Sequence, residues 1–237
     1  MSDFHKLGAF SKTDAQIALE GVDPKFVEEG LIRARQKSWE VFKEIREGLK
    51  EGMTELEARR LTLDLFKARG VTRHWHQPYI RFGAGTLLTF NNPLQPDYHL
   101  KSGDAVYIDL GPVWSDEELG LDYEGDVGDS FAFGHNPESE KAAAAARQLF
   151  EEARKEWREK NLNGEQIYAF LKTRTEALGY RFEPIPEGHR VADFPHQKYS
   201  RESIAGLTFH PSRSIWVLEV QLAHPTLPIG AFYEDLL

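Results

Sequence analysis

The chain places its expected helices and strands in the same order twice, and this repetition constrains its fold more than any other feature. In the first half, apolar residues recur at helical spacing from Pro24 to about residue 50. A second helix is expected from the capping box of Thr54 and Glu57 to Gly70. Strand-like runs separated by turn residues follow: "VTRHWHQPYIRFG", "TLLTFNN", "DAVYIDLGPVW" and "DYEGDVGDSFAF".

The second half repeats this order. Asn136 and Pro137 are a typical N-cap and first turn, so a helix is expected from there towards Lys160, and another from about Asn163 to Leu178. The strand-like runs "YRFEPI", "GLTFHP", "SIWVLEVQLA" and "GAFYEDLL" complete the chain. This order predicts an α+β fold in which two similar halves join their antiparallel strands into one curved sheet, with helices on its outer face.

Size and charge narrow the class of protein. The 237 residues are 41% hydrophobic, which is enough to form the core of one domain. We expect this domain over residues 23–237, after a polar and aperiodic arm of residues 1–22. A net charge of -9 disfavours nucleic acid and anionic membrane as partners. The absence of cysteine excludes a thiolate metal site. No N-terminal basic and apolar signal is visible, and no apolar run is long enough to span a membrane, so we expect a soluble cytoplasmic protein.

Two expected strands carry a single acid at their centre. In "AVYIDLGPVW", Val106, Ile108 and Leu110 occupy one face, and Asp109 is the only charged residue on the other. Glu219 holds the equivalent position in "SIWVLEVQLA". Burying an isolated carboxylate is costly or raises its pKa until it is neutral, so each of these acids is expected to have a partner.

A third acid lies in "DYEGDVGDSFAF". Asp126 shares its face with small side chains such as Gly128 and Ser130, whereas Asp129 falls on the opposite face with Phe131 and needs a partner of its own. Each strand taken alone fits a water-filled groove or an ion pair with an arginine. Three such strands together favour a bound cation.

Two residues of the second half complete a recognisable order. His189 follows a glycine in a loop, and Glu234 lies three residues from the C-terminus; neither stands out on local grounds. The contexts are "YIDLGP", "YEGD", "GH", "WVLEVQ" and "GAFYED", in the order Asp109, Asp126, His189, Glu219, Glu234. Over about residues 24–237, the chain thereby resembles the family of methionine aminopeptidase, aminopeptidase P and prolidase, whose fold is called pita-bread.

The resemblance implies a site for two divalent ions. Asp109 would chelate one ion, Asp126 and Glu234 would bridge both, and His189 and Glu219 would complete the other. Oxygen donors with one imidazole suit Mn, Fe, Co or Zn, and we expect Mn. The nucleophile would be a metal-activated hydroxide, with Glu219 transferring its proton.

The resemblance also suggests residues that contact substrate. His196, seven residues after His189, matches a second family histidine with a catalytic and substrate-binding role. Asn91 stands where methionine aminopeptidases place a further histidine, and it cannot supply a proton as imidazole can. His76 and Trp75, in "RHWHQPYIRFG", are expected to line the pocket, with plain strand packing as the alternative.

These observations predict a metallopeptidase-like hydrolase that acts on a small peptide, as an aminopeptidase or Xaa-Pro dipeptidase would. Asn91 and the loop after His189, which lacks the family's glycine-rich run, keep open a small-molecule amide or C–N hydrolase on the same scaffold. A non-catalytic binding member of the family is the third interpretation. No counterpart of the extra N-terminal domain of aminopeptidase P and prolidase is visible, and on this ground we expect a homodimer.

Overall fold

The computed structural model describes residues 14–195, 198 and 200–237. Its main feature is a six-stranded antiparallel sheet. In spatial order, the strands are β2 (Tyr79–Phe82), β3 (Ala105–Leu110), β6 (Val127–Ala132), β9 (Gly230–Leu236), β8 (Val217–Ala223) and β7 (Arg181–Glu183). The first half of the chain therefore forms one side of the sheet and the second half forms the other. The two halves meet where β6 pairs with β9, which confirms the predicted joining of two similar halves.

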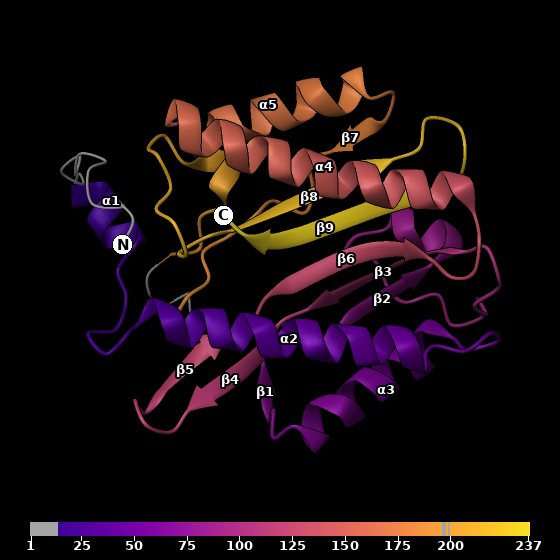
Figure 1. Ribbon diagram of the computed structural model, residues 1–237, viewed down its shortest axis with the longest axis horizontal. Coiled ribbons are helices and arrows are strands. Elements are labelled where there is room, and N and C mark those ends of the chain that lie inside the picture. Colours follow the sequence, from indigo (N-terminus) through magenta and orange to yellow (C-terminus); the bar gives the residue numbers. More distant parts are fainter. Residues whose placement is uncertain (1–13, 196–197, 199) are drawn as a thin grey trace, which may run out of the picture.

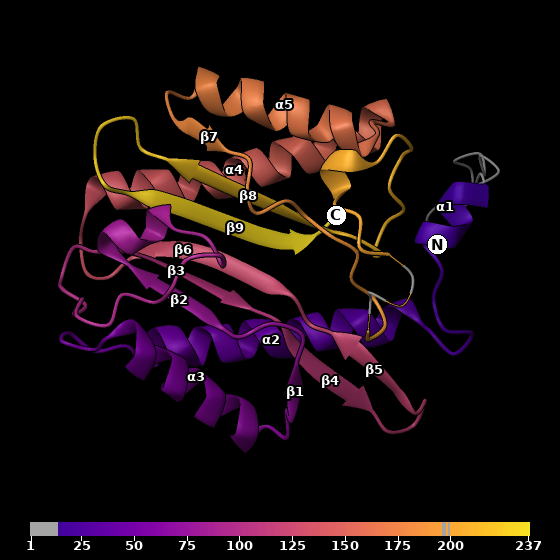
Figure 2. The same ribbon diagram turned by 180° about the vertical axis from the view of Figure 1, so that it is seen from behind.

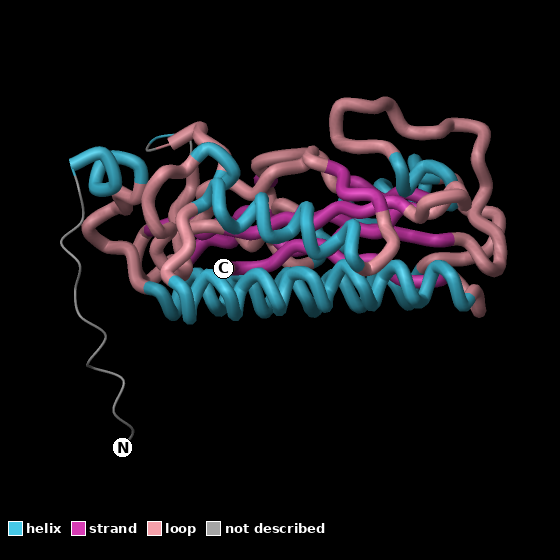
Figure 3. The backbone as a smooth tube through the Cα atoms, turned by 90° about the horizontal axis from the view of Figure 1, so that it is seen from above, coloured by secondary structure: helices cyan, strands magenta, loops and turns pink. Residues whose placement is uncertain are grey.

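Two pairs of helices accompany the two halves: α2 (Glu28–Gly48) with α3 (Glu55–Ala68), and α4 (Pro137–Lys160) with α5 (Gly164–Ala177). The long helices α2 and α4 cover one face of the sheet, while loops gather on the other (Figures 1 and 3). Figure 2 shows this loop-covered face from the front. The capping box of Thr54 and Glu57 is present, and Asn136 caps α4 as predicted. The predicted first helix begins at Glu28, four residues later than Pro24.

The core lies between the sheet and these helices. Leu149 and Phe150 of α4 are fully buried, as are Ile108 of β3 and Val220 of β8. Each such side chain contributes about 1.5–3 kcal/mol to stability by leaving water. The alternation expected for these strands is thus confirmed, because their apolar face is the one beneath the helices.

Charged residues on the helix-covered face have partners there. Nη2 of Arg147, in α4, lies 2.7 Å from Oδ2 of Asp129. Arg35 of α2 binds Asp235 of β9 in the same way. Asp129 therefore has the partner that the sequence required. Because neighbouring strand residues point to opposite faces, Gly128 and Glu234 face away from the helices.

A small second sheet branches off the first. It consists of β1 (Arg73–His74), β4 (Pro112–Asp116) and β5 (Leu121–Glu124). The run "DAVYIDLGPVW", expected as one strand, is divided at Gly111 between β3 and β4. The break brings β1 and the residues after it close to the end of β3, since the backbone N–H of Trp75 donates to the carbonyl of Gly111 at 3.0 Å.

Two of the strand predictions were wrong. "TLLTFNN" begins in the 3₁₀ helix η1 (Gly83–Leu87) and continues as a loop. The buried guanidinium of Arg81 donates hydrogen bonds to backbone carbonyls of this loop, at 2.8 Å to Thr89 and 2.6 Å to Asn92. "GLTFHP" begins at the last residue of the short helix η3 (Ile204–Gly206) and continues as a loop. The carbonyl of its Leu207 accepts the N–H of Glu165, at the start of α5, at 3.2 Å. In both places these hydrogen bonds occupy backbone carbonyls that strand pairing would have used.

The expected N-terminal arm is only partly described, because residues 1–13 lie outside the described residues. Residues of its second part form the helix α1 (Asp14–Leu19). Glu20, which is 5% exposed, accepts hydrogen bonds from Nε1 of Trp216 at 2.9 Å and from the backbone N–H of Ser212 at 2.6 Å. This end of the arm is therefore packed against the domain.

Within the part of the chain that the structure describes, no helix combines the length and the apolar character needed to cross a bilayer.

Candidate metal centre

Three carboxylates lie in one row across the loop-covered face of the large sheet. Asp109 of β3 is paired with Gly128, Gly128 with Glu234 of β9, and Glu234 with Glu219 of β8. Directly paired residues of antiparallel strands point to the same side, so these acids converge. A Cβ at Gly128 would lie 2.4 Å from Cε1 of Phe232, so the row has room for no side chain at its centre.

Asp126 lies just before β6 and is 2% exposed. Its Oδ2 accepts a hydrogen bond from Nε1 of Trp75 at 3.0 Å and lies 2.9 Å from Nε2 of His189. Its Oδ1 lies 3.5 Å from Nε2 of His76. Each oxygen of this one carboxylate therefore faces a different imidazole.

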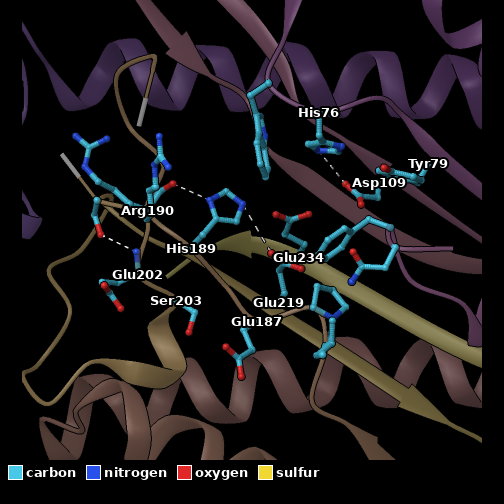
Figure 4. A pocket seen from close by; sticks show the side chains of 17 residues that line it. His76, Tyr79, Asp109, Glu187, His189, Arg190, Glu202, Ser203, Glu219 and Glu234 are labelled. Carbon is cyan, nitrogen blue, oxygen red and sulfur yellow. Dashed lines mark hydrogen bonds and ion pairs between the residues drawn. The ribbon is translucent and has the colours of Figure 1, made fainter. Parts of the chain in front are cut away.

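The two imidazoles also reach the other acids of the centre. Nε2 of His76 lies 3.3 Å from Oδ1 of Asp109, and Nε2 of His189 lies 3.7 Å from Oε1 of Glu219. In Figure 4, His76 lies next to Asp109, and His189 lies on the other side of the carboxylates of the second half. The indole of Trp75 packs against both, with ring centroids 4.5 Å from each imidazole.

Burial is the main influence on three of the carboxylates. It raises the pKa of Glu219 and of Glu234 well above the ordinary value, and the neighbouring acids add to the effect. Burial also raises the pKa of Asp109 to about 6, although His76 opposes the rise. Without cations, the centre therefore retains protons that reduce the repulsion among its acids.

The histidines and Asp126 stabilise one another in charged form. Burial acts to raise the pKa of Asp126, but hydrogen bonds with His189 and His76 outweigh it and hold the pKa below the ordinary value. Burial acts to lower the pKa of each histidine, but the neighbouring carboxylates outweigh it and raise both to about 9. A metal ion would replace these protons, because it needs the neutral imidazole and the ionised acid.

The donors fit a pair of divalent ions. Two groups of three residues have ligand atoms that all lie within 4.8 Å of one another: His76, Asp109 and Asp126, and Asp126, His189 and Glu234. Asp126 belongs to both groups, as a bridging carboxylate would. Carboxylates combined with imidazoles suit Mn, Fe, Co or Zn.

A cavity of about 610 Å³ opens above the centre. Asp109, His189, Glu219 and Glu234 line it, while Asp126 lies buried beneath. Its apolar part includes Phe90 and Ile185, which are 49% and 47% exposed and lie with Tyr79 and Pro186 in the lining.

The predicted site residues thus have different outcomes. The five expected ligands are brought together in one centre, and Asn91, His76 and Trp75 line the cavity, while their contact with substrate stays a prediction. His196 lies outside the described residues. The contacts of His76 and Trp75 with the ligands were not predicted; the local signal was an aromatic residue between two histidines in one expected strand, of which only Arg73 and His74 form β1.

Gly111 controls how closely His76 and Trp75 approach the acids. A Cβ there would lie 2.3 Å from Cδ2 of His76 and 2.5 Å from Nε1 of Trp75. We expect Gly111→Ala to displace both rings and to weaken binding of divalent metal at least about tenfold, as changes behind metal ligands do. Calorimetric titration with Mn²⁺ measures this. Gly206→Ala is the matched control, because a Cβ at Gly206 meets nothing within 4 Å; equal affinity of the two variants would contradict the prediction.

Comparisons with known proteins agree with this architecture. The family model described as metallopeptidase family M24 matches residues 29–217. A prolidase from Thermococcus sibiricus has a TM-score of 0.70 and 19% identity, covering 88% of this chain and 55% of its own. An X-Pro aminopeptidase from Thermotoga maritima has a TM-score of 0.70 and 18% identity, covering 88% of this chain and 56% of its own. The chain therefore spans little more than half the length of these two proteins.

A methionine aminopeptidase from Thermotoga maritima has a TM-score of 0.69 and 15% identity, covering 91% of this chain and 93% of its own. The search among curated proteins found no match. At identities this low, likeness to solved structures concerns the fold alone, and it confirms the predicted pita-bread architecture.

Proposed function

Since this chain belongs to metallopeptidase family M24, we propose that it is a hydrolase that cleaves the amide bond of a small peptide with two divalent ions bound. The observation that carries the proposal is the position of Asp126. Its two oxygens face two separate imidazoles, and it is shared by both groups of donors. A carboxylate so placed is suited to bridge two ions, and the resemblance of the whole ligand order supports the same role.

Divalent ions, when bound, supply activation of water at neutral pH and polarisation of the carbonyl that is attacked. Proton transfer must be carried out by side chains of the protein. We assign proton transfer to Glu219, which accepts the proton of the attacking water and returns it to the leaving amine nitrogen. Its carboxylate lines the cavity, with Oε1 3.7 Å from Nε2 of His189, where a bound peptide could reach it.

The cavity supports a small peptide as the substrate. Its exposed apolar residues, Phe90 and Ile185, would contact an apolar side chain, whereas Glu187 and Glu202 in the lining would attract a free amino group. The aminopeptidase or Xaa-Pro dipeptidase class combines these two features. His196 and Asn91 complete the proposed set of substrate contacts.

Further parts of the proposal rest on the sequence alone. We expect both ions to be Mn²⁺, because most of the proposed ligands are carboxylates. A cytoplasmic location and a homodimer are also proposed.

Hydrolysis of small non-peptide amides is the second candidate, and Asn91 favours it. Its amide can form hydrogen bonds but cannot donate a proton as an imidazolium does, so a substrate with a better leaving group would suit this cavity.

A substrate screen of the Mn²⁺-loaded protein tests these candidates. The panel contains Xaa-Pro dipeptides, other dipeptides, longer peptides with free or acetylated amino ends, and small amides of similar volume. We expect hydrolysis of peptides with a free amino end, and two ions per chain by elemental analysis. Turnover of the amides alone would select the second candidate, and no turnover of any compound by protein holding two ions would contradict both.

A further inference from the structure

The two imidazoles of the centre are held in the same way. Nδ1 of His76 is hydrogen-bonded to the carbonyl of Gln77 at 2.8 Å, and Nδ1 of His189 to the carbonyl of Arg190 at 2.7 Å. A carbonyl can only accept, so each Nδ1 carries the hydrogen, and Nε2 of the neutral ring keeps its lone pair. This is the tautomer of a histidine that binds a metal through Nε2.

Both lone pairs are directed at the same buried carboxylate. Nε2 of His76 lies 3.5 Å from Oδ1 of Asp126, and Nε2 of His189 lies 2.9 Å from Oδ2. Nε2 of His76 also lies 3.3 Å from Oδ1 of Asp109. His76 therefore forms a group of possible ligands with Asp109 and Asp126, just as His189 does with Asp126 and Glu234.

The ring of His76 is confined on several sides. Tyr79 stacks on it with an interplanar angle of 11° and a centroid distance of 5.7 Å, and Trp75 packs edge-on against it. A Cβ at Gly111 would lie 2.3 Å from Cδ2 of His76, so the ring occupies the space that a side chain there would need. Nε2 of His76 lies 3.3 Å from Oδ1 of Asp109 and 3.5 Å from Oδ1 of Asp126, so the free nitrogen of the ring is turned towards two of the expected ligands.

We propose that His76 is a sixth protein ligand, so that each half of the chain supplies three donors, one of them an imidazole. One ion would be held by His76, Asp109 and Asp126, all from the first half. The other would be held by His189 and the two acids of the second half, Glu219 and Glu234, with Asp126 and Glu234 as the bridging acids that the resemblance implies. This assignment rests on the two-ion centre of the proposed function and adds a ligand to it.

An added imidazole changes which metals the first position accepts. An all-oxygen position is suited to Mg²⁺ and Mn²⁺, whereas nitrogen donors favour Fe²⁺, Co²⁺ and Zn²⁺. His76 should therefore give this position a preference for the later divalent metals of the first row over Mg²⁺.

Titration of the metal-free protein with Co²⁺ tests the assignment by calorimetry and by visible absorption, without any measurement of turnover. The wild-type protein should bind two ions per chain. His76→Gln should weaken one of them at least about tenfold and change its absorption band, since even partners behind a ligand are worth 10–100-fold. His74→Gln is the matched control. Its ring lies on the same segment but contacts the side chain of Gln77, at 2.8 Å, and it should leave both affinities unchanged.

The outcomes separate this inference from the proposed function. Two ions with wild-type affinities and an unchanged spectrum in folded His76→Gln protein would overturn the role of His76 and leave the two-ion centre intact. Fewer than two ions on the wild-type protein would overturn both. A zinc-loaded crystal structure of the wild-type protein decides the matter if the variant does not fold: Nε2 of His76 at about 2.0–2.1 Å from zinc is expected, and a non-bonded distance would reject the ligand.

Discussion

Replacing Asp126 with Asn should remove the carboxylate that both groups of ligands share, and with it most of the activity and the binding of two ions. Each oxygen of Asp126 faces one imidazole, at 3.5 Å for His76 and 2.9 Å for His189. An amide keeps one oxygen and replaces the other with an N–H₂ group, which cannot bind a cation. Loss of a partner behind a metal ligand costs about 10–100-fold, so loss of the bridging ligand should reduce kcat/KM at least about a hundredfold. Elemental analysis should find fewer than two ions per chain.

Asp129→Asn is the matched control for this variant. Asp129 lies three residues further along the same stretch but faces α4, where Arg147 pairs with it at 2.7 Å. Because this ion pair is partly exposed, its loss should cost about 1 kcal/mol or less and should leave metal content and turnover unchanged. Full activity in Asp126→Asn, or an equal loss in both variants, would contradict the assigned bridge.

The second large effect is expected far from the chemistry, at Glu55. Oε1 of this buried carboxylate accepts the N–H of Phe82 at 3.1 Å, and Oε2 accepts that of Gln95 at 2.8 Å. Oε2 also lies 3.3 Å from Nη1 of Arg81, which is equally inaccessible to water. Glu55→Ala removes all three contacts and leaves a buried guanidinium without its counter-ion. We expect a loss of about 3–5 kcal/mol in the free energy of unfolding, measured by urea denaturation of the metal-free protein.

The same variant should impair substrate binding, because Arg81 orders the loop that carries Phe90 and Asn91 into the cavity. KM should therefore rise more than kcat falls. Glu57→Ala is the control: Glu57 lies in the same helical turn, but it is exposed and serves only the capping box. Similar losses of stability in the two variants would show that the buried ion pair carries little of the effect.

The helix starts were predictable because the interactions that define them span only three residues. Thr54 and Glu57 satisfy each other's backbone groups, and Asn136 accepts from the two residues that follow Pro137. The strand centres were predictable for a similar reason. The alternation of apolar and polar residues around Asp109 and Glu219 reports which side chains share a face, whatever the strand later pairs with.

Contacts between distant segments were not predictable in this way. Residues 86–92 were expected to form a strand, but they continue from η1 into a loop whose carbonyls at Thr89 and Asn92 accept from the guanidinium of Arg81. His76 was assigned to the cavity lining, since nothing in its neighbourhood shows that the chain bends at Gly111. That bend brings His76 to within 3.3 Å of Asp109.

The segment from Asp122 to Gly134 separates what the sequence determines from what the tertiary structure decides. By itself, the sequence determined the ordered set of four acids and one histidine, and the strand positions of three of the acids, Asp109, Glu219 and Glu234. It also determined the opposite faces of Asp126 and Asp129. Only the tertiary structure decided which face lies beneath α4 and meets Arg147, and which face is open to the cavity and meets two imidazoles. The physical reason is range: alternation along a strand is a local property, whereas the partner of a buried charge depends on how separate halves of the chain pack.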